Sequence, residues 1–366
     1  MAGSTYGTIF RISTWGESHG KAIGVVIDGC PAGLELDETD IQPFLNRRKP
    51  GQSVFSTPRS EDDAVEILSG VFEGKTTGTP ISMIVYNKSQ QSRDYSEIAS
   101  YYRPGHADYT FDAKYGFRDY RGGGRSSGRE TTARVAAGAV AIKILNQLGI
   151  TFTTYTQSIG NIAIDYNAFD EQEIFNNKLY MPDANAASKA ADYVIKMTEE
   201  HNSVGGCVEG IIKGVPAGLG DTVFEKLDAN LAKALMSIGA VKCVEIGDGI
   251  NVSKMTGSEN NDGFSFTEET GIQKNSNHAG GILGGMSDGS DIKIRASFKA
   301  TPSILKTQQT VNKNNENIEV SIKGRHDPIV VPRAVVVVEA MAAITILDAL
   351  LLNMTSTIDG IKKFYQ

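Results

Sequence analysis

The sequence predicts an α+β protein in which one strand-and-helix unit occurs twice. The segment G-x-P-A-G-L stands at 29–34 and again at 214–219, an offset of 185 residues in a chain of 366. An apolar, strand-like run precedes each copy, a helical pattern follows it, and each half of the chain finishes with a long helix rich in Ala and Val. No linker rich in Pro or Ser divides the halves, so we expect one pseudo-symmetric domain over 1–366, with repeats at about 7–150 and 200–353. Chance similarity between two strand–turn–helix signals is the alternative.

The two long helices have recognisable beginnings. The segment 129–148 is rich in Ala and starts beside an expected capping box, because Ser127 lies three residues before Glu130. The segment 332–353 is apolar on nearly every face and begins with Pro, which favours the first turn of a helix. Both segments are therefore expected to be core helices.

The remaining elements follow from periodicity and from Gly, Pro and Asn breakers. The polar stretches 157–192 and 257–277 are expected to be surface insertions or loops. In chain order the expected elements are strand 24–27, helix 38–46, strand 81–86, helix 129–148, helix 186–200, strand 207–212, helix 224–237, strand 243–246, strand 292–298 and helix 332–353.

The formal charge of −7 is distributed unevenly. Residues 41–60 carry +4, residues 103–134 carry +3 and residues 293–333 carry +5, which leaves −19 on the rest of the chain. An acidic shell argues against bulk binding of nucleic acid or of an anionic membrane. Small basic islands favour small anionic ligands instead.

Nothing in the sequence indicates export or a membrane span. The N-terminal segment lacks the basic start and apolar core of a signal peptide, and the most apolar stretch contains Glu339 and Asp348. The three cysteines are isolated from one another, which is typical of reduced thiols. We therefore expect a cytoplasmic protein.

The segment 121–134, RGGGRSSGRETTAR, is the strongest candidate for an anion site. Three glycines allow close backbone approach, two serines offer hydroxyl groups, and the loop enters a helix N-terminus that favours anions. Arg121, Arg125, Arg129 and Arg134 can add charge-assisted hydrogen bonds. A flexible glycine turn with solvated arginines is the alternative. The spacing fits neither G-x-G-x-x-G nor a P-loop.

Three of the five histidines lie in glycine-framed polar loops. His19 stands in GESHG, His106 in RPGHAD and His326 in GRHDP, each near an acidic residue, which suits acid–base chemistry near pH 7. A structural role is the alternative for each of them. His278 is a weaker candidate and His201 is not one. Since no two histidines are three or four residues apart, we expect no metal site.

Two further segments could meet a flat or phosphorylated ligand. The segment 280–289, GGILGGMSDG, has five glycines, and the segment 299–303, KATPS, offers Lys, Thr and Ser groups to a phosphate. Close packing alone is the alternative explanation of the glycines.

Taken together, the motifs resemble the chorismate synthase family. GESHG at 16–20, GRSSGRETTARVAAGA at 124–139 and GRHDPIVVPRA at 324–334 are similar to its three signature regions. NRRKPGQS, RPGHADYT, ALMSIGAVKCVEIGDG and SNHAGGILGG are similar to other family segments. The resemblance runs in the expected order from about residue 7 to residue 352.

The resemblance implies a reaction and a cofactor. The family converts 5-enolpyruvylshikimate 3-phosphate to chorismate by trans-1,4 elimination of phosphate, the last common step of aromatic biosynthesis. It requires reduced FMN although the reaction has no net redox change. A substrate with one phosphate and two carboxylates, beside the FMN phosphate, explains the need for basic islands.

The resemblance also assigns roles to single residues. His19 would protonate the departing phosphate, His106 would protonate the reduced flavin near N1, and Asp327 would assist proton removal through flavin N5. FMN contacts are implied at Arg125, Ser126, Ser127, Gly239, Ala240, Gly284, Lys299, Ala300, Thr301, Pro302, Ser303 and Arg325. Substrate contacts are expected at Arg48, Arg103 and Arg134.

The sequence departs from the family pattern at the cofactor rim. Val54 stands where many relatives have a second basic residue, Gly239 replaces a common Asn, and KATPS differs from the frequent K-P-T-S-S. Family annotation ties the position of Arg48 to NADP, whereas we expect it to face substrate anions.

The family fold is a β-α-β sandwich of antiparallel sheets flanked by helices, usually assembled as a homotetramer. Because the chain has no dinucleotide motif or appended reductase domain, we expect the monofunctional type. An external flavin reductase or another source would then supply reduced FMN, and NADPH would act only indirectly. A flavin-dependent oxidoreductase and a non-catalytic protein that binds phospholigands or RNA are the rival interpretations.

Overall fold

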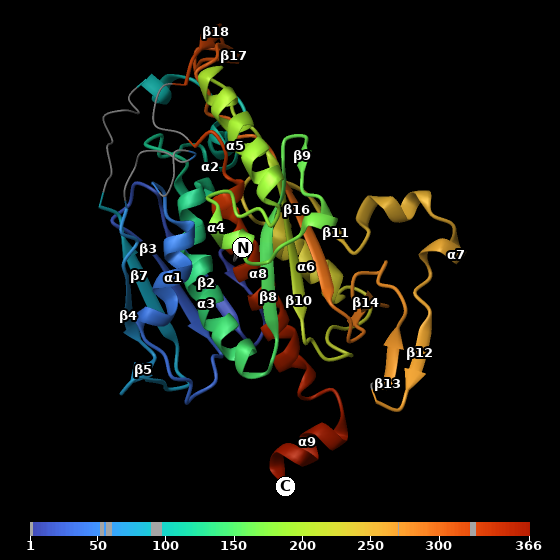
Figure 1. Ribbon diagram of the computed structural model, residues 1–366. Helices are drawn as coiled ribbons and strands as arrows, with labels where there is room; N and C mark the ends of the chain where they lie inside the picture. Colours follow the sequence, from blue (N-terminus) through green and yellow to red (C-terminus); the bar gives the residue numbers. More distant parts are fainter. Residues whose placement is uncertain (1–2, 52–54, 56–60, 89–96, 270, 323–326) are drawn as a thin grey trace.

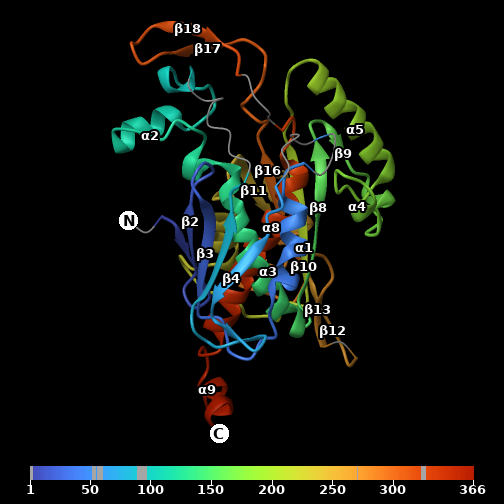
Figure 2. The same ribbon diagram turned by 90° about the vertical axis from the view of Figure 1, so that its left-hand side faces the viewer.

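The computed structural model describes residues 3–51, 55, 61–88, 97–269, 271–322 and 327–366. The described residues form a mixed structure of helices and antiparallel sheets (Figure 1). Two five-stranded sheets stand on either side of a central group of helices (Figure 2). One continuous cluster of buried apolar side chains includes residues of both sheets and of the helices between them.

The two sheets are antiparallel throughout. In spatial order the first sheet contains β1 (Thr5–Tyr6), β2 (Arg11–Gly16), β3 (Ala22–Asp28), β7 (Ile81–Tyr86) and β4 (Val65–Ser69). The second contains β11 (Val241–Ile246), β16 (Ile292–Phe298), β10 (Gly206–Lys213), β8 (Thr151–Ile159) and β9 (Ile162–Ala163). Hairpins pair β5 (Val71–Phe72) with β6 (Lys75–Thr76), β12 (Phe264–Thr267) with β13 (Gly271–Lys274), β14 (Ile282–Leu283) with β15 (Met286–Ser287) and β17 (Gln308–Val311) with β18 (Asn317–Val320).

Helices fill the space between the sheets and extend beyond it. The α-helices are α1 (Glu38–Arg48), α2 (Asp108–Tyr115), α3 (Thr131–Gln147), α4 (Glu173–Asn176), α5 (Ala184–Glu199), α6 (Leu227–Met236), α7 (Gly257–Asn260), α8 (Val331–Asn353) and α9 (Ile358–Tyr365). Short 3-10 turns are η2 (Glu97–Ser100), η3 (Gly124–Ser126), η4 (Gly128–Glu130), η5 (Tyr166–Ala168) and η6 (Gly249–Lys254). Helix α9 projects at the end of the molecule opposite α2 and the β17–β18 hairpin (Figure 1).

Helices α3 and α8 pack against each other and each covers one sheet. Helix α3 contacts β2, β3 and β7, whereas α8 contacts β8 and β10. They approach closely at Gly138, where an added Cβ would lie 2.3 Å from the Cβ and 2.5 Å from the Cα of Ala340. Only a residue without a side chain fits at this crossing, so Gly138 sets the spacing between the two halves.

The two G-x-P-A-G-L turns have the same hydrogen bonds. The hydroxyl of Thr76 donates to the Pro31 carbonyl at 2.7 Å, and that of Ser287 donates to the Pro216 carbonyl at 2.6 Å. Each hydroxyl oxygen also accepts from the backbone N–H of the turn's leucine, at 3.0 and 2.9 Å. The strand before each turn, β3 or β10, is the middle strand of its sheet.

Most predicted elements are confirmed within a few residues. Strands 81–86 and 292–298 match β7 and β16 in full, and the long helices match α3 and α8. Strands β2, β4 and β8 were not predicted. The prediction for 157–192 is wrong in part, because this stretch begins inside β8, contains α4 and buries Ile174 and Met181.

The predicted capping box at the start of α3 is wrong. The hydroxyl of Ser127 accepts the N–H of Arg129 at 3.2 Å and so caps the 3-10 turn η4. The carboxylate of Glu130 pairs with the Arg134 guanidinium at 2.9 Å, one helical turn further on. The basic side chains nearby draw Glu130 away from the backbone N–H that a capping box requires.

Helix α8 is long and apolar enough to cross a membrane by length and composition. Within the described part of the protein, 72% of its most apolar window is buried. Its position between α3 and the second sheet confirms the prediction of a core helix.

The close contact at the Gly138–Ala340 crossing predicts that one added methyl group lowers the stability of the protein. In Gly138→Ala, higher helix propensity contributes about 1 kcal/mol of stability, but overpacking of a filled core costs about 1–3 kcal/mol. We therefore expect a net loss of up to about 2 kcal/mol in the free energy of unfolding, measured by urea denaturation. Gly257→Ala is the control, because an added Cβ there meets no atom within 4 Å. Equal stability of the two variants would contradict this account of the crossing.

Candidate active site

Loops from both halves of the chain meet at one end of the helix layer. The turn between β2 and β3, the segment between β7 and α3, and the segment between β16 and α8 all lie there. Both long helices also begin at this end. The basic islands of the sequence therefore come together where helix N-termini favour anions.

His19 lies in the turn between β2 and β3 and is buried. Its Nδ1 is 3.1 Å from the Ser18 hydroxyl. The glycine loop packs directly on the ring, because an added Cβ at Gly122 would lie 2.5 Å from His19 Nδ1. The glycine therefore permits the close approach of this loop to the imidazole.

Arg125 fastens the glycine loop to β2 without neutralising its own charge. Its Nη1 donates to the Gly16 carbonyl at 3.0 Å, and its Nη2 donates to the Thr14 hydroxyl at 2.6 Å. The next two residues, Ser126 and Ser127, hydrogen-bond within the same turn. The predicted cationic loop beside His19 is thus present.

Arg103 connects this loop with the loop of His106. Its Nε and Nη2 donate to the Asp108 carboxylate at 2.8 and 2.7 Å, and both side chains are buried. Arg103 Nη2 also donates to the Gly122 carbonyl at 3.3 Å. Burial raises the pKa of Asp108, but hydrogen bonds and charge from Arg103, with a further contribution from Arg118, outweigh it and hold the pKa below its usual range.

His106 meets the predicted FMN segment 299–303. Its Nε2 lies 2.8 Å from the Ser303 hydroxyl and its Nδ1 lies 2.9 Å from the Pro104 carbonyl. Because a carbonyl oxygen only accepts, Nδ1 carries a proton and Nε2 exchanges a hydrogen bond with Ser303. Lys299 Nζ donates to the Gly105 carbonyl at 2.8 Å, which joins the same two segments.

Gly239 and Ala240 lie next to this segment. The Lys299 N–H donates to the Ala240 carbonyl at 2.9 Å. An added Cβ at Gly239 would meet no atom within 4 Å, so its backbone is open. The side-chain oxygen of Thr301 is buried and has no hydrogen-bond partner among the described residues.

Arg48 belongs to a buried cluster of two guanidiniums and one carboxylate. Its Nη2 donates to Asp63 Oδ2 at 2.8 Å, and Arg129 Nη1 pairs with Asp63 Oδ1. The side chains of Arg48 and Asp63 are 1% and 0% exposed. Burial lowers the pKa of Arg48 to about 10, although the nearby Asp63 charge opposes this shift.

Asp327 and Arg134 lie at the edges of this assembly. Asp327 forms an ion pair with Arg333, and Arg333 Nε donates to the Arg48 carbonyl at 2.9 Å. Arg134 Nη1 donates to the Ser237 hydroxyl at 2.6 Å, close to Gly239 in the chain. Arg325, His326 and Val54 lie outside the described residues.

Gly284 is the predicted FMN contact that lies apart from the others. It occupies the turn of the β14–β15 hairpin, which stands near the first residues of β16. Lys299 follows the opposite end of β16, roughly 20 Å away for a strand of this length. Within the described chain, Gly284 is not brought to the other predicted FMN contacts.

Sequence reasoning missed the carboxylates that hold the arginines. Asp63 comes from an acidic run before β4, and Asp108 was counted only as an acid near His106. Asn87 was also missed, although its amide donates to the Gly20 carbonyl at 2.8 Å and its oxygen accepts from Arg129 Nε at 2.9 Å. No local spacing signals these pairings.

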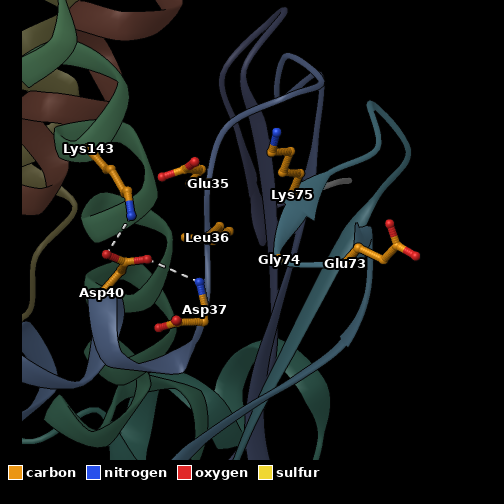
Figure 3. A pocket seen from close by; sticks show the side chains of 8 residues that line it. All are labelled: Glu35, Leu36, Asp37, Asp40, Glu73, Gly74, Lys75 and Lys143. Atoms are coloured by element: carbon orange, nitrogen blue, oxygen red, sulfur yellow. Dashed lines mark hydrogen bonds and ion pairs between the residues drawn. The ribbon is translucent and has the colours of Figure 1, made fainter.

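A separate pocket of about 330 Å³ lies at the other end of α1 (Figure 3). Its charged lining side chains are Glu35, Asp37, Asp40, Glu73, Lys75 and Lys143. Carboxylates outnumber lysines there, and Lys143 is paired with Asp40. The pocket therefore does not suit a polyanionic ligand, and the loops around His19 and His106 are the better candidate.

Comparisons with known proteins identify the family of the chain. The chorismate synthase family model matches residues 10–351. The chorismate synthase of Agathobacter rectalis is 68% identical over 366 residues, 100% of both chains. That of Methanosarcina mazei is 54% identical over 354 residues, 96% of this chain and 97% of the relative. A crystal structure of chorismate synthase aligns with a TM-score of 0.76 and 32% identity over 98% of this chain and 97% of that chain.

Buried arginines and two histidines at one end of paired antiparallel sheets are typical of an enzyme site for a small polyanion. The chain belongs to the chorismate synthase family of carbon–oxygen lyases. The family reaction releases phosphate from 5-enolpyruvylshikimate 3-phosphate to form chorismate in the shikimate pathway.

The Arg103–Asp108 pair predicts a specific loss of stability in acid. The lowered pKa of Asp108 means that its contribution is complete above the unfolded pKa near 4 and is lost as pH falls through the lower folded pKa. Asp108→Asn leaves the guanidinium without its carboxylate, so we expect a loss of about 3–5 kcal/mol at pH 7.

The stability of Asp108→Asn should also depend less on pH than that of the parent protein. The fall in unfolding free energy between pH 7 and pH 3, measured with urea, should be smaller by up to about 1.3 kcal/mol than in the parent. Asp359→Asn on exposed helix α9 serves as the control for loss of one carboxylate. An unchanged pH dependence in Asp108→Asn would refute the assignment.

Proposed function

We propose that this chain performs the elimination with reduced FMN bound between the loop at 125–127, the turn at 239–240 and the segment 299–303. The unpartnered hydroxyl of Thr301 and the open backbone of Gly239 fit a ligand with many acceptors. Arg125 and Lys299 supply positive charge that backbone carbonyls orient but do not cancel. Arg325 would complete the contacts. When bound, the flavin supplies electron density while the carbon–oxygen bond breaks.

The hydrogen bond between His106 and Ser303 is the observation that carries the proposal. It joins the predicted proton donor to the predicted FMN segment, although 197 residues separate them in the chain. The Pro104 carbonyl fixes the tautomer of His106, so Nε2 is the nitrogen that exchanges a proton on the Ser303 side. Nε2 of His106 would therefore be the group that holds a proton for the bound reduced flavin near N1.

His19 and Asp327 have the other proton-transfer roles. His19, buried beneath the glycine loop, protonates the departing phosphate, which gains charge as it leaves. With the flavin bound, Asp327 would assist removal of the C6 proton on its N5 side. The Arg333 ion pair keeps Asp327 near the Arg48 cluster.

Arg48, Arg103 and Arg134 bind the anionic groups of the substrate. Each is already oriented by a carboxylate, which reduces the freedom lost on binding. Helix N-termini at the same end of the molecule add favourable potential for anions.

The architecture that supports this site is a β-α-β sandwich made by internal duplication within one domain, 1–366. The support is the matching order of elements. In each half, the middle strand leads through G-x-P-A-G-L to a helix, and that helix leads to an edge strand, β4 or β11, after which the long helix follows. The matched bonds of Thr76 and Ser287 are hard to explain by chance.

Family membership supports several further proposals about the assembled enzyme. The chain forms a homotetramer, resides in the cytoplasm and receives reduced FMN from an external reductase or another source. NADPH acts only indirectly, as the source of electrons for that flavin.

An anaerobic assay tests the reaction itself. The protein is mixed with reduced FMN and 5-enolpyruvylshikimate 3-phosphate without oxygen, and phosphate, chorismate and flavin absorbance are followed. We expect many equivalents of phosphate and chorismate for each flavin, with no net flavin oxidation. Stoichiometric flavin oxidation would instead identify an oxidoreductase.

A substitution tests the role of His106. In His106→Ala, loss of the proton donor should lower turnover under saturating reduced FMN at least about 100-fold. Binding of oxidised FMN, measured by fluorescence quenching, should change less than about fivefold, because other groups hold the cofactor. His201→Asn is the control, since His201 is exposed and its φ of +57° is one that Asn tolerates. Full turnover in His106→Ala would rule out the assignment.

A further inference from the structure

The cluster around Asp63 has an unusual balance of charge for a buried site. Two guanidiniums, of Arg48 and Arg129, share the one carboxylate of Asp63. The cluster therefore keeps a net charge of +1 although its three side chains are between 0% and 11% exposed. Buried ion groups that serve only the fold are normally balanced, because an uncompensated buried charge is costly.

Two donors of the cluster also remain unused. Arg48 Nε and Arg129 Nη2 are buried and have no hydrogen-bond partner among the described residues. Buried guanidinium donors without acceptors point to an anionic ligand that supplies them. Arg48 Nη1 donates to the Gly128 carbonyl at 3.3 Å, which ties the cluster to the start of α3.

The backbone conformation of Asp63 is an independent observation that indicates a functional site. Its φ is +48°, a left-handed conformation that non-glycine residues adopt at a cost in free energy. This conformation accompanies a carboxylate that reaches Arg48 with Oδ2 and Arg129 with Oδ1. Strain of this kind persists where surrounding contacts require it, and such places are often functional sites.

The cluster is also joined to the turn that contains His19. Arg129 Nε donates to Asn87 Oδ1 at 2.9 Å, and the Asn87 amide donates to the carbonyls of Glu17 and Gly20 at 3.0 and 2.8 Å. A change in the position of Arg129 is therefore transmitted to the loop beside the predicted proton donor.

We propose that Asp63 is a positioning residue, which holds the guanidiniums of Arg48 and Arg129 in one arrangement for an anionic group of the substrate. The inference rests on the proposed function, because that function supplies the anion. Asp63 does not touch the substrate in this proposal. It acts through the two arginines, and without it two buried like charges repel each other.

Positioning and simple charge attraction predict opposite effects of Asp63→Asn on substrate binding. Asp63→Asn raises the cluster charge from +1 to +2, so electrostatic attraction alone predicts tighter anion binding. An asparagine oxygen cannot accept from both guanidiniums in the same way, since its second terminal group is a donor. If Asp63 positions the arginines, substrate binding weakens despite the added charge.

The measurement is calorimetric binding of 5-enolpyruvylshikimate 3-phosphate with oxidised FMN and no reductant, so that no turnover occurs. We expect the Kd of Asp63→Asn to rise at least about tenfold, which corresponds to about 1.4 kcal/mol. KM should rise by a similar factor. Asp62→Asn is the matched control, because Asp62 is 72% exposed and pairs with Lys88 at the surface. An unchanged or lower Kd in Asp63→Asn would overturn the proposal.

A second variant keeps the test decisive if Asp63→Asn does not fold. Asp63→Glu retains the carboxylate but is one methylene longer, so the cluster keeps its net charge of +1 while its geometry changes. A higher Kd for the substrate in Asp63→Glu, at a nearly unchanged midpoint of unfolding, supports positioning. A Kd equal to that of the parent protein refutes it. A parent that forms no chorismate in the anaerobic assay would contradict the proposed function, whereas parental binding by both variants would contradict only this inference.

Discussion

The close approach of α3 and α8 fixes the relation between the two halves of the molecule. Gly138 and Ala340 leave no room for larger side chains at the crossing, so each helix can lie on its own sheet and against the other helix. Because interiors are densely packed, a shift at this point would move one sheet relative to the other. Every loop at the active-site end extends from elements whose position depends on this contact.

The crossing also determines which groups the two long helices place at the candidate site. Helices α3 and α8 both begin at the candidate site, so their N-terminal N–H groups and positive dipole ends lie at the same end of the molecule. The glycine loop, which packs on His19, leads into α3. Asp327 precedes α8 and pairs with Arg333 of that helix. Two helix N-termini and two strand ends thereby bring together residues 19, 106, 125, 299 and 327.

The sequence predicted the site's loops better than its internal bonds, and physical reasons account for the difference. Strand β7 is largely apolar and β16 alternates apolar with polar residues over most of its length, whereas β2 and β8 contain Thr and Ser at several positions, so their burial depends on neighbours that a local pattern does not contain. Glycine-framed histidines are visible within a few residues. The Asp63–Arg129 pair joins positions 66 apart, and nothing local in the chain signals such a partner.

The structure changes the meaning of the basic islands. Within the described residues, Arg103, Arg118 and Arg121 are paired with Asp108, Asp112 and Asp119, so these three arginines add nothing to the net charge of +3 that the segment 103–134 carries. Arg125 and Lys299 are held by neutral acceptors, and the Arg48–Arg129 pair shares a single carboxylate. Part of the surplus charge thus lies where the cofactor and substrate are proposed to bind. Since a paired arginine contributes little attraction at a distance, selection of a polyanion depends on these few unbalanced cations and not on the net charge of the segments.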